Sequence, residues 1–225
     1  MNKLISFVHL DFITVKPYFT AKNLLIFAAV AVFLTTMSGN IGAGMGVGIM
    51  LGTLFISYPF AVGEKSNMDV LYATLSINRK TVVAGRYLFA FSLNLCAVLM
   101  SMVLAAVGII ISGNFGLIMG TGEILLAGLL LAAVFIVIQA LQLPFFFKMG
   151  YTKAKFFSLV PFVALMSGYL AFMSASKDNG FVSRIEEALE RLTGGALIAL
   201  VVPALFLVCY CSYRLSLLFY KKREF

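Results

Sequence analysis

The sequence predicts an all-α membrane protein with six transmembrane helices. Hydrophobic residues make up 62% of the chain and charged residues 12%, and the apolar residues gather in six long runs. Each run approaches or exceeds the ~20 residues with which a helix crosses a ~30 Å hydrocarbon core, and a helix satisfies its own backbone hydrogen bonds there. The predicted spans are residues 21–36, 45–62, 82–112, 124–147, 156–175 and 196–213, within a single transmembrane domain of residues 1–225.

The distribution of Lys and Arg predicts how these helices are oriented. Basic residues gather in the N-terminal segment, before the third span, after the fourth span and at the C-terminus. Lys177, Arg184 and Arg191 are left for the opposite side. Because basic loops stay in the cytoplasm, both termini are predicted to be cytoplasmic. The net charge of +8 follows from this asymmetry, which favours contact with membrane lipid, and no basic face outside the membrane indicates nucleic-acid binding.

Residues 1–20 are predicted to form an amphipathic helix on the membrane surface. At 100° per residue, six apolar side chains share one face: Leu4, Ile5, Val8, Phe12, Val15 and Phe19. An apolar face beside Lys residues is typical of an interfacial elbow helix. An ordinary lead-in to the first span is the alternative. Pro17 permits a bend between this segment and the span.

A glycine-rich stretch lies at the start of the second span. Gly44, Gly48 and Gly52 recur every four residues and share one helix face, a pattern that lets helix backbones approach closely in lipid. The spacing does not match the G-x-G-x-x-G of dinucleotide-binding loops, so that type of site is excluded. We expect a helix–helix contact at these glycines, within one subunit or between two.

A short helix is predicted at residues 66–75, between the second and third spans. Ser66 and Asp69 have the spacing of a capping box, in which each side chain binds the other residue's backbone N–H. The apolar face of this helix comprises Met68, Leu71, Tyr72 and Leu75. The face could pack on the protein's own bundle or enter a groove on a partner, and both alternatives remain open. Arg79 and Lys80 follow as a basic turn that places charge at the lipid headgroups.

A second amphipathic helix is predicted outside the membrane, just before the sixth span. Within residues 175–195, Glu187 precedes Arg191 by four positions, which stabilises a helix. An apolar stripe runs along the same segment: Val182, Ile185, Leu189 and Leu192. The helix could cap the mouth of the bundle or remain a solvated loop helix.

The sequence lacks the residue patterns of several classes of enzyme and carrier. It contains no G-x-x-x-x-G-K-[ST] loop for ATP, and one His with three Cys does not suggest a metal site. The predicted spans are nearly free of charge, whereas ion-coupled carriers keep ionisable groups there. We therefore expect no catalytic residues, no metal ligands and no bound cofactor in this chain. Energy for transport would come from another subunit.

A few polar side chains lie inside the predicted spans: Asn94, Ser101, Gln139 and Gln142. Interhelical hydrogen bonds are one interpretation of these residues. The other is that Asn94 and Gln139 line a cavity.

The layout resembles the permease subunits of bacterial type-2 ABC exporters. The resemblance covers the elbow, the six spans, the second cytoplasmic segment and the external helix, and locally it is carried by residues 64–69 and 75–88. Small bacterial permeases have a similar acidic stretch and short helix there, followed by a Leu-Pro-[Val/Ile]-Ser-Arg-like turn. This chain differs at Ser76, where proline is common, and at Asn78, where serine is common. Within the family it is most similar to exporters of phenol-soluble modulins, which are short amphipathic peptide toxins.

This resemblance implies ATP-driven export across the bacterial cell membrane. Two permease copies would pair with two copies of a separate ATP-binding subunit, which holds ATP and Mg. The helix at residues 67–75 would be the coupling helix that seats in that subunit. The substrates would be amphipathic or hydrophobic, with toxin or antimicrobial peptides among them. The alternative functions are a non-transport membrane regulator or assembly factor and a secondary carrier, and the charge-free spans disfavour the carrier.

Overall fold

The chain folds into helices. A computed structural model describes residues 3–18, 20–38, 45–46, 55–74, 77–113, 121–157, 160, 163–164, 167 and 194–223. Within these residues all regular structure is helical and no strand occurs. The predicted all-α class is therefore confirmed.

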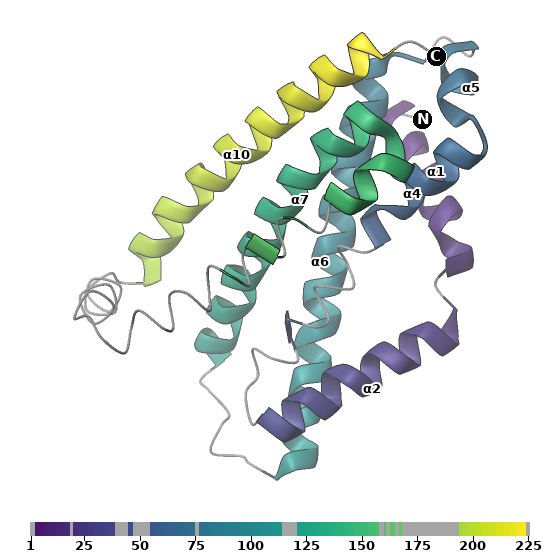
Figure 1. Cartoon of the computed structure of the whole chain (residues 1–225). Coiled ribbons are helices and arrows are strands. Elements are labelled where there is room, and N and C mark those ends of the chain that lie inside the picture. The colour runs from purple at the N-terminus through teal and green to yellow at the C-terminus, as the bar shows by residue number, and fades with distance from the viewer. Residues whose placement is uncertain are drawn as a thin grey trace.

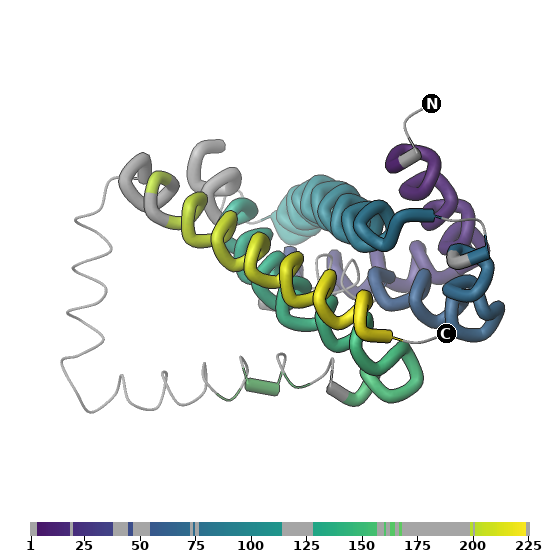
Figure 2. Tube along the Cα trace, turned by 90° about the horizontal axis from the view of Figure 1, so that it is seen from above, coloured from purple at the N-terminus to yellow at the C-terminus, as the bar shows by residue number. Residues whose placement is uncertain are grey.

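Three long helices form the frame of the molecule. They are α6 (Arg79–Ser112), α7 (Thr121–Phe157) and α10 (Gly194–Lys222). Each contains a stretch long and apolar enough to cross a membrane. Helix α10 packs along α7, and it meets α6 at one end and diverges from it toward the other (Figures 1 and 2).

The N-terminal arm is bent. Helix α1 (Lys3–Val15) and a short 3₁₀ turn (Lys16–Tyr18) precede α2 (Ala21–Ser38), and the chain bends by 81° between them. Pro17 lies in the turn, where its fixed φ and missing N–H do not interrupt an α-helix. Helix α2 corresponds to the predicted first span.

The buried face of α1 differs from the predicted apolar face. Phe7, Asp11 and Val15 are buried, whereas Ile5 is 60% exposed and Phe12 is also exposed. The predicted face was assigned to the membrane surface, and the exposure of Ile5 and Phe12 is compatible with that, so the interfacial elbow stays a prediction. On another side the helix docks on α6 through a stripe that contains a carboxylate.

Helix α2 crosses α6 through a contact between small residues. A Cβ added to Gly108 would lie 2.7 Å from the Cβ of Thr35, which is too close for any other residue without movement. The Thr35 hydroxyl donates to the carbonyl of Ala31 at 2.8 Å, so its polar group is satisfied within α2. The contact predicted at Gly44, Gly48 and Gly52 lies outside the described residues and stays a prediction.

Two short helices connect the arm to the frame. Helix α4 (Tyr58–Lys65) ends with Ser66 as its C-cap, and α5 (Met68–Thr74) begins after Asn67, which has a φ of +50°. Asn tolerates this left-handed conformation better than most residues. The predicted capping box is therefore wrong, since Ser66 closes α4 instead of opening α5. The helix also starts two residues later than predicted, and Leu75 lies outside the described residues.

A buried hydroxyl chain joins the three frame helices. Pro144 lies inside α7 and cannot donate to the carbonyl of Ala140, one turn earlier. The Ser212 hydroxyl of α10 donates to that carbonyl instead. Tyr87 of α6 bonds both Ser212 and, at 2.8 Å, Ser216. Ser212 gives its proton to Ala140, so it must accept from Tyr87, which in turn accepts from Ser216.

The structure describes part of the predicted set of spans. Within the described residues, α6, α7 and α10 qualify as spans, and α1 with α2 passes the same test when the bent pair is taken together. The predicted second span (45–62) is described only near its two ends, and the predicted fifth span (156–175) at a few positions. The external helix predicted within residues 175–195 lies outside the described residues, except Gly194 and Gly195. Six spans therefore remain a prediction.

Candidate functional site at the α5 end of the bundle

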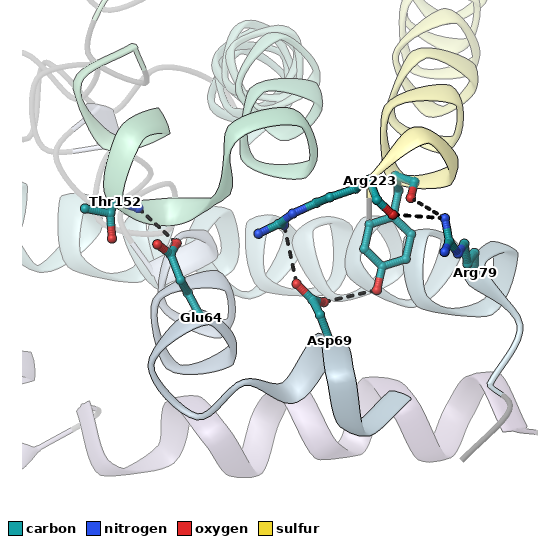
Figure 3. Close-up of polar contacts among 6 residues, drawn as sticks. Glu64, Asp69, Arg79, Thr152 and Arg223 are labelled. Carbon is teal, nitrogen blue, oxygen red and sulfur yellow. Dashed lines mark hydrogen bonds and ion pairs between the residues drawn. The ribbon is translucent and has the colours of Figure 1, made fainter. Parts of the chain in front are cut away.

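Helix α5 lies where α6 begins, α10 ends and α7 turns back on itself (Figure 1). Polar side chains from separate segments meet at this end (Figure 3): Glu64 of α4, Asp69 of α5, Arg79 of α6 and Arg223, which follows α10. They fasten α5 and its neighbour α4 to the long helices.

The apolar residues of α5 point in two directions. Tyr72 is 4% exposed and meets the ring of Phe7 edge-on at 5.2 Å, while Met68 packs on the same core. Val70 and Leu71 are 47% and 49% exposed. The short helix therefore has an anchored side that faces the bundle and an apolar side that faces outward.

Asp69 links α5 to the last residues of the chain that are described. Its carboxylate accepts a hydrogen bond from the Tyr220 hydroxyl at 3.0 Å and pairs with the Arg223 guanidinium at 3.4 Å (Figure 3). The sequence had suggested a local capping function for this residue. Its carboxylate instead holds α5 against the end of α10.

Arg79 closes the end of α10. Its guanidinium donates to the backbone carbonyls of Tyr220 at 3.0 Å, of Lys221, and of Arg223 at 3.4 Å (Figure 3). The last carbonyls of a helix have no partner within the helix and carry partial negative charge, so a cation stabilises them. Lys80, the other member of the predicted basic turn, is exposed, and its backbone N–H bonds the side chain of Asn78 at 3.0 Å. Asn78 is the N-cap of α6.

Glu64 holds the turn at which α7 reverses. Gly150 interrupts α7 with φ +74° and ψ 175°, and Glu64 accepts a hydrogen bond from the backbone N–H of Thr152 at 3.0 Å. Burial raises the pKa of Glu64, but hydrogen bonds from Thr152 and Tyr151 and the charge of Arg223 lower it by more, so its pKa lies below the ordinary 4.5. A carboxylate at this position also offsets the helix dipole of the segment that starts there.

A buried ion pair fastens α1 to α6. Arg86 and Asp11 are 3.1 Å apart, and both side chains are nearly inaccessible. The rings of Phe60 and Phe7 lie over the guanidinium, with centroids at 4.8 and 5.7 Å. Burial raises the pKa of Asp11 from 3.8 to about 6, against the opposing effect of Arg86. The charges compensate each other, so the two helices depend on this contact.

Asn94 and Gln139 lie deeper in the bundle, away from α5. Both are buried, on α6 and α7, and neither amide finds a hydrogen-bond partner among the described residues. A buried polar group left without a partner costs ~1–3 kcal/mol. Gln139 lines a recess of about 10 Å³ beside Tyr87 and Cys209.

Comparison with known families decides what kind of protein this is. The model of a family described as ABC-2 family transporter protein matches residues 6–221. The chain belongs to this family. No match was found among curated proteins or among solved structures. The chain is thus a multi-pass membrane permease subunit of an ABC transporter, and the family implies pairing with an ATP-binding ABC subunit.

The permease's α5 end contains residues that the sequence did not reveal. No partner had been predicted for Arg86, Asp11 or Glu64. A usable signal existed, because Asp11 is an acid inside an apolar helix and Arg86 a base inside an apolar run. Opposite charges in two such segments favour a buried pair. Within the described residues, no cluster of His, Cys, Asp and Glu could hold a metal ion.

Proposed function

We propose that this permease is the membrane half of an ATP-driven exporter, in which α5 receives the motion of the ATP-binding subunit. Two permeases would pair with two such subunits, which supply ATP and Mg. The observation that carries the proposal is the outward-facing pair Val70 and Leu71 on a helix that is anchored on its other side. A small apolar surface on a fixed helix suits insertion into a partner's groove.

The anchors of α5 suggest how its motion would reach the membrane. Asp69 connects α5 to the end of α10, and Tyr72 connects it to Phe7 of α1. ATP-driven closure of the partner subunits would displace α5, and both contacts would carry that displacement into the long helices. The space between the two permeases would then change shape.

The proposal places α5 and both termini in the cytoplasm of a bacterial cell. Its support is that α5, the start of α6 and the end of α10 lie together, and that the basic residues near them include Lys65, Arg79 and Lys222. Positive charge marks the cytoplasmic side. Amphipathic or hydrophobic molecules, with short amphipathic peptides such as phenol-soluble modulins among them, are the proposed substrates on the strength of the sequence resemblance.

The test removes the outward side of α5 and keeps the anchors. A Val70→Ala/Leu71→Ala permease should remain folded but retain much less ATP-binding subunit on co-purification, since buried apolar anchors of small interfaces contribute more than ~1 kcal/mol each. The peptide-stimulated ATPase activity of the purified complex should fall together with the amount of ATP-binding subunit retained. Ile5→Ala/Ile13→Ala, which trims exposed apolar residues of α1, is the matched control. Tyr72 is unsuitable because it is buried. Unchanged ATPase retention and export in the α5 variant would refute the proposal.

A further inference from the structure

An apolar groove opens where α6 and α10 diverge. It has a volume of about 490 Å³. Its lining includes Leu88 and Phe91 of α6 and Val202, Phe206 and Tyr210 of α10. Leu88, Phe91 and Phe206 are exposed, so the groove is accessible from the side of the helices. Exposed apolar side chains of a membrane-spanning helix are suited to contact with lipid acyl chains.

The groove continues inward to a polar group. The small recess that holds Gln139 shares Tyr87, Phe91, Ile136 and Cys209 with the groove. Gln139 is 3% exposed, and both polar atoms of its amide lack a partner among the described residues. A bound molecule with a hydrogen-bonding group next to an apolar chain would satisfy that amide.

A cation lies against Tyr210, which lines the same groove. Arg214 follows Tyr210 by one turn of α10, and its guanidinium donates to the Tyr210 hydroxyl at 3.5 Å and lies 5.9 Å from the ring centroid. Among the described residues, this guanidinium contacts Tyr210 through both its hydroxyl and its ring. Because Ser212 binds the carbonyl of Ala140, Arg214 and Gln139 lie at nearly the same depth along the bundle. The groove thus combines an apolar body, an unpartnered amide and a positive charge near one level.

We propose that this groove binds an anionic phospholipid of the surrounding membrane. One acyl chain lies between α6 and α10, Arg214 and the Tyr210 hydroxyl bind the phosphate, and the Gln139 amide binds an ester carbonyl. Arg presents several N–H donors in a planar fork that fits phosphate oxygens, and basic pockets between transmembrane helices attract anionic headgroups. A fully apolar groove would fit any lipid, whereas the charge selects an anionic one. This inference does not depend on which substrate the transporter exports.

The chain has no tryptophan, so a single introduced tryptophan is a specific reporter. Phe206→Trp places it in the groove. Leu207→Trp places it on the next residue, which is exposed but does not line the groove, at the same depth. The full permease is reconstituted in phosphatidylcholine vesicles that contain either brominated phosphatidylglycerol or brominated phosphatidylcholine, whose bromines quench nearby tryptophan. In the Phe206→Trp variant, we expect brominated phosphatidylglycerol to bind beside the tryptophan about fivefold more strongly than brominated phosphatidylcholine. In the Leu207→Trp variant, we expect the two lipids to bind equally.

Arg214 variants complete the test. In the Phe206→Trp background, Arg214→Gln should abolish the fivefold preference, Arg214→Lys should keep part of it, and Lys222→Gln should leave it unchanged. Equal quenching by the two lipids at 206, or a preference that survives Arg214→Gln, would overturn the proposal. Absence of quenching at 206 with normal quenching at 207 would show that protein or a peptide substrate fills the groove, which also overturns it.

Discussion

Arg79 and Arg86 lie two turns apart on α6 and depend on different partners. Arg79 remains at the helix end, where it binds the terminal carbonyls of α10. Arg86 is buried and has its charge compensated by Asp11. Loss of Arg79 would remove a helix cap, whereas loss of Arg86 would leave a carboxylate buried without a counter-charge. The second loss is the more costly, because breaking one side of a buried pair typically costs ~3–5 kcal/mol.

We predict that Arg86→Met lowers the free energy of unfolding by about 3–5 kcal/mol and loosens α1 from α6. The double variant Asp11→Leu/Arg86→Met should recover most of this loss, since no charge then remains buried. Thermal unfolding in detergent micelles measures both. If the double variant were as unstable as the single one, packing rather than charge would explain the contact.

The stability of the Arg86→Met variant should depend on pH, with a sign that follows from the pKa of Asp11. Burial already raises the pKa of Asp11 to about 6, and removal of Arg86 takes away the opposing effect and raises it further. The folded state therefore binds the proton more tightly than the unfolded state, so stability falls as pH rises from about 4 through the folded pKa. The defect of Arg86→Met should be smaller at pH 5 than at pH 8. A defect that grows on acidification would contradict the assignment.

At the scale of whole elements, the reversal of α7 and the docking of α5 use the same device. In each case a carboxylate on a short helix binds the end of a long one: Glu64 binds the N–H of Thr152, and Asp69 binds Tyr220 and Arg223. Neither short helix has enough residues to be stable alone. Their positions are therefore set by these tertiary contacts, and by the conformation of Gly150.

Gly150→Ala should destabilise the protein more than Gly113→Ala. Both glycines have positive φ, but a Cβ at Gly150 would also lie 2.9 Å from the Glu64 carboxylate, whereas a Cβ at Gly113 would meet nothing within 4 Å. The combination of φ +74° and ψ 175° at Gly150 is moreover accessible almost exclusively to glycine. We expect a loss of more than about 2 kcal/mol at position 150 and about 1 kcal/mol at 113. Equal melting temperatures of the two variants would exclude a special function for the Gly150 turn.

At the scale of the whole molecule, α5, the start of α6 and the end of α10 lie together. Their shared location supports the orientation proposed above, with all three on the cytoplasmic side. Lys80→Cys and Ser112→Cys, at the two ends of α6, should react with a membrane-impermeant maleimide from opposite sides, with Lys80→Cys on the cytoplasmic side. Cys96, Cys209 and Cys211 would first be replaced by Ala. Labelling of both positions from one side would show that α6 does not cross the membrane, and reversed labelling would contradict the proposed orientation.

The parts of this fold that the sequence predicted correctly depend on local properties. The lengths and hydropathy of α6, α7 and α10 are set by consecutive residues, so their apolar runs were sufficient to predict these helices. The inward face of α1 was missed because Asp11 is explained only by Arg86, which is distant in sequence. The helix at α5 was predicted, but its division into an inner Tyr72 and an outer Leu71 depends on Phe7. Burial of individual side chains is a property of the assembled bundle.

The bent N-terminal arm also has a mechanical consequence. Its first half is fixed to α6 at Arg86 and its second half at Gly108, positions roughly 33 Å apart along that helix. The arm and α6 therefore form a closed triangle, braced at both ends of one side. A triangle cannot change its angles while its sides keep their lengths, so α6 cannot tilt relative to the arm unless one corner yields. The corner at Lys16–Tyr18 has no buried side chain to resist bending. Bending at that turn alone therefore cannot tilt α6, and a change in its tilt relative to the arm requires the contact at Arg86 or the contact at Gly108 to open.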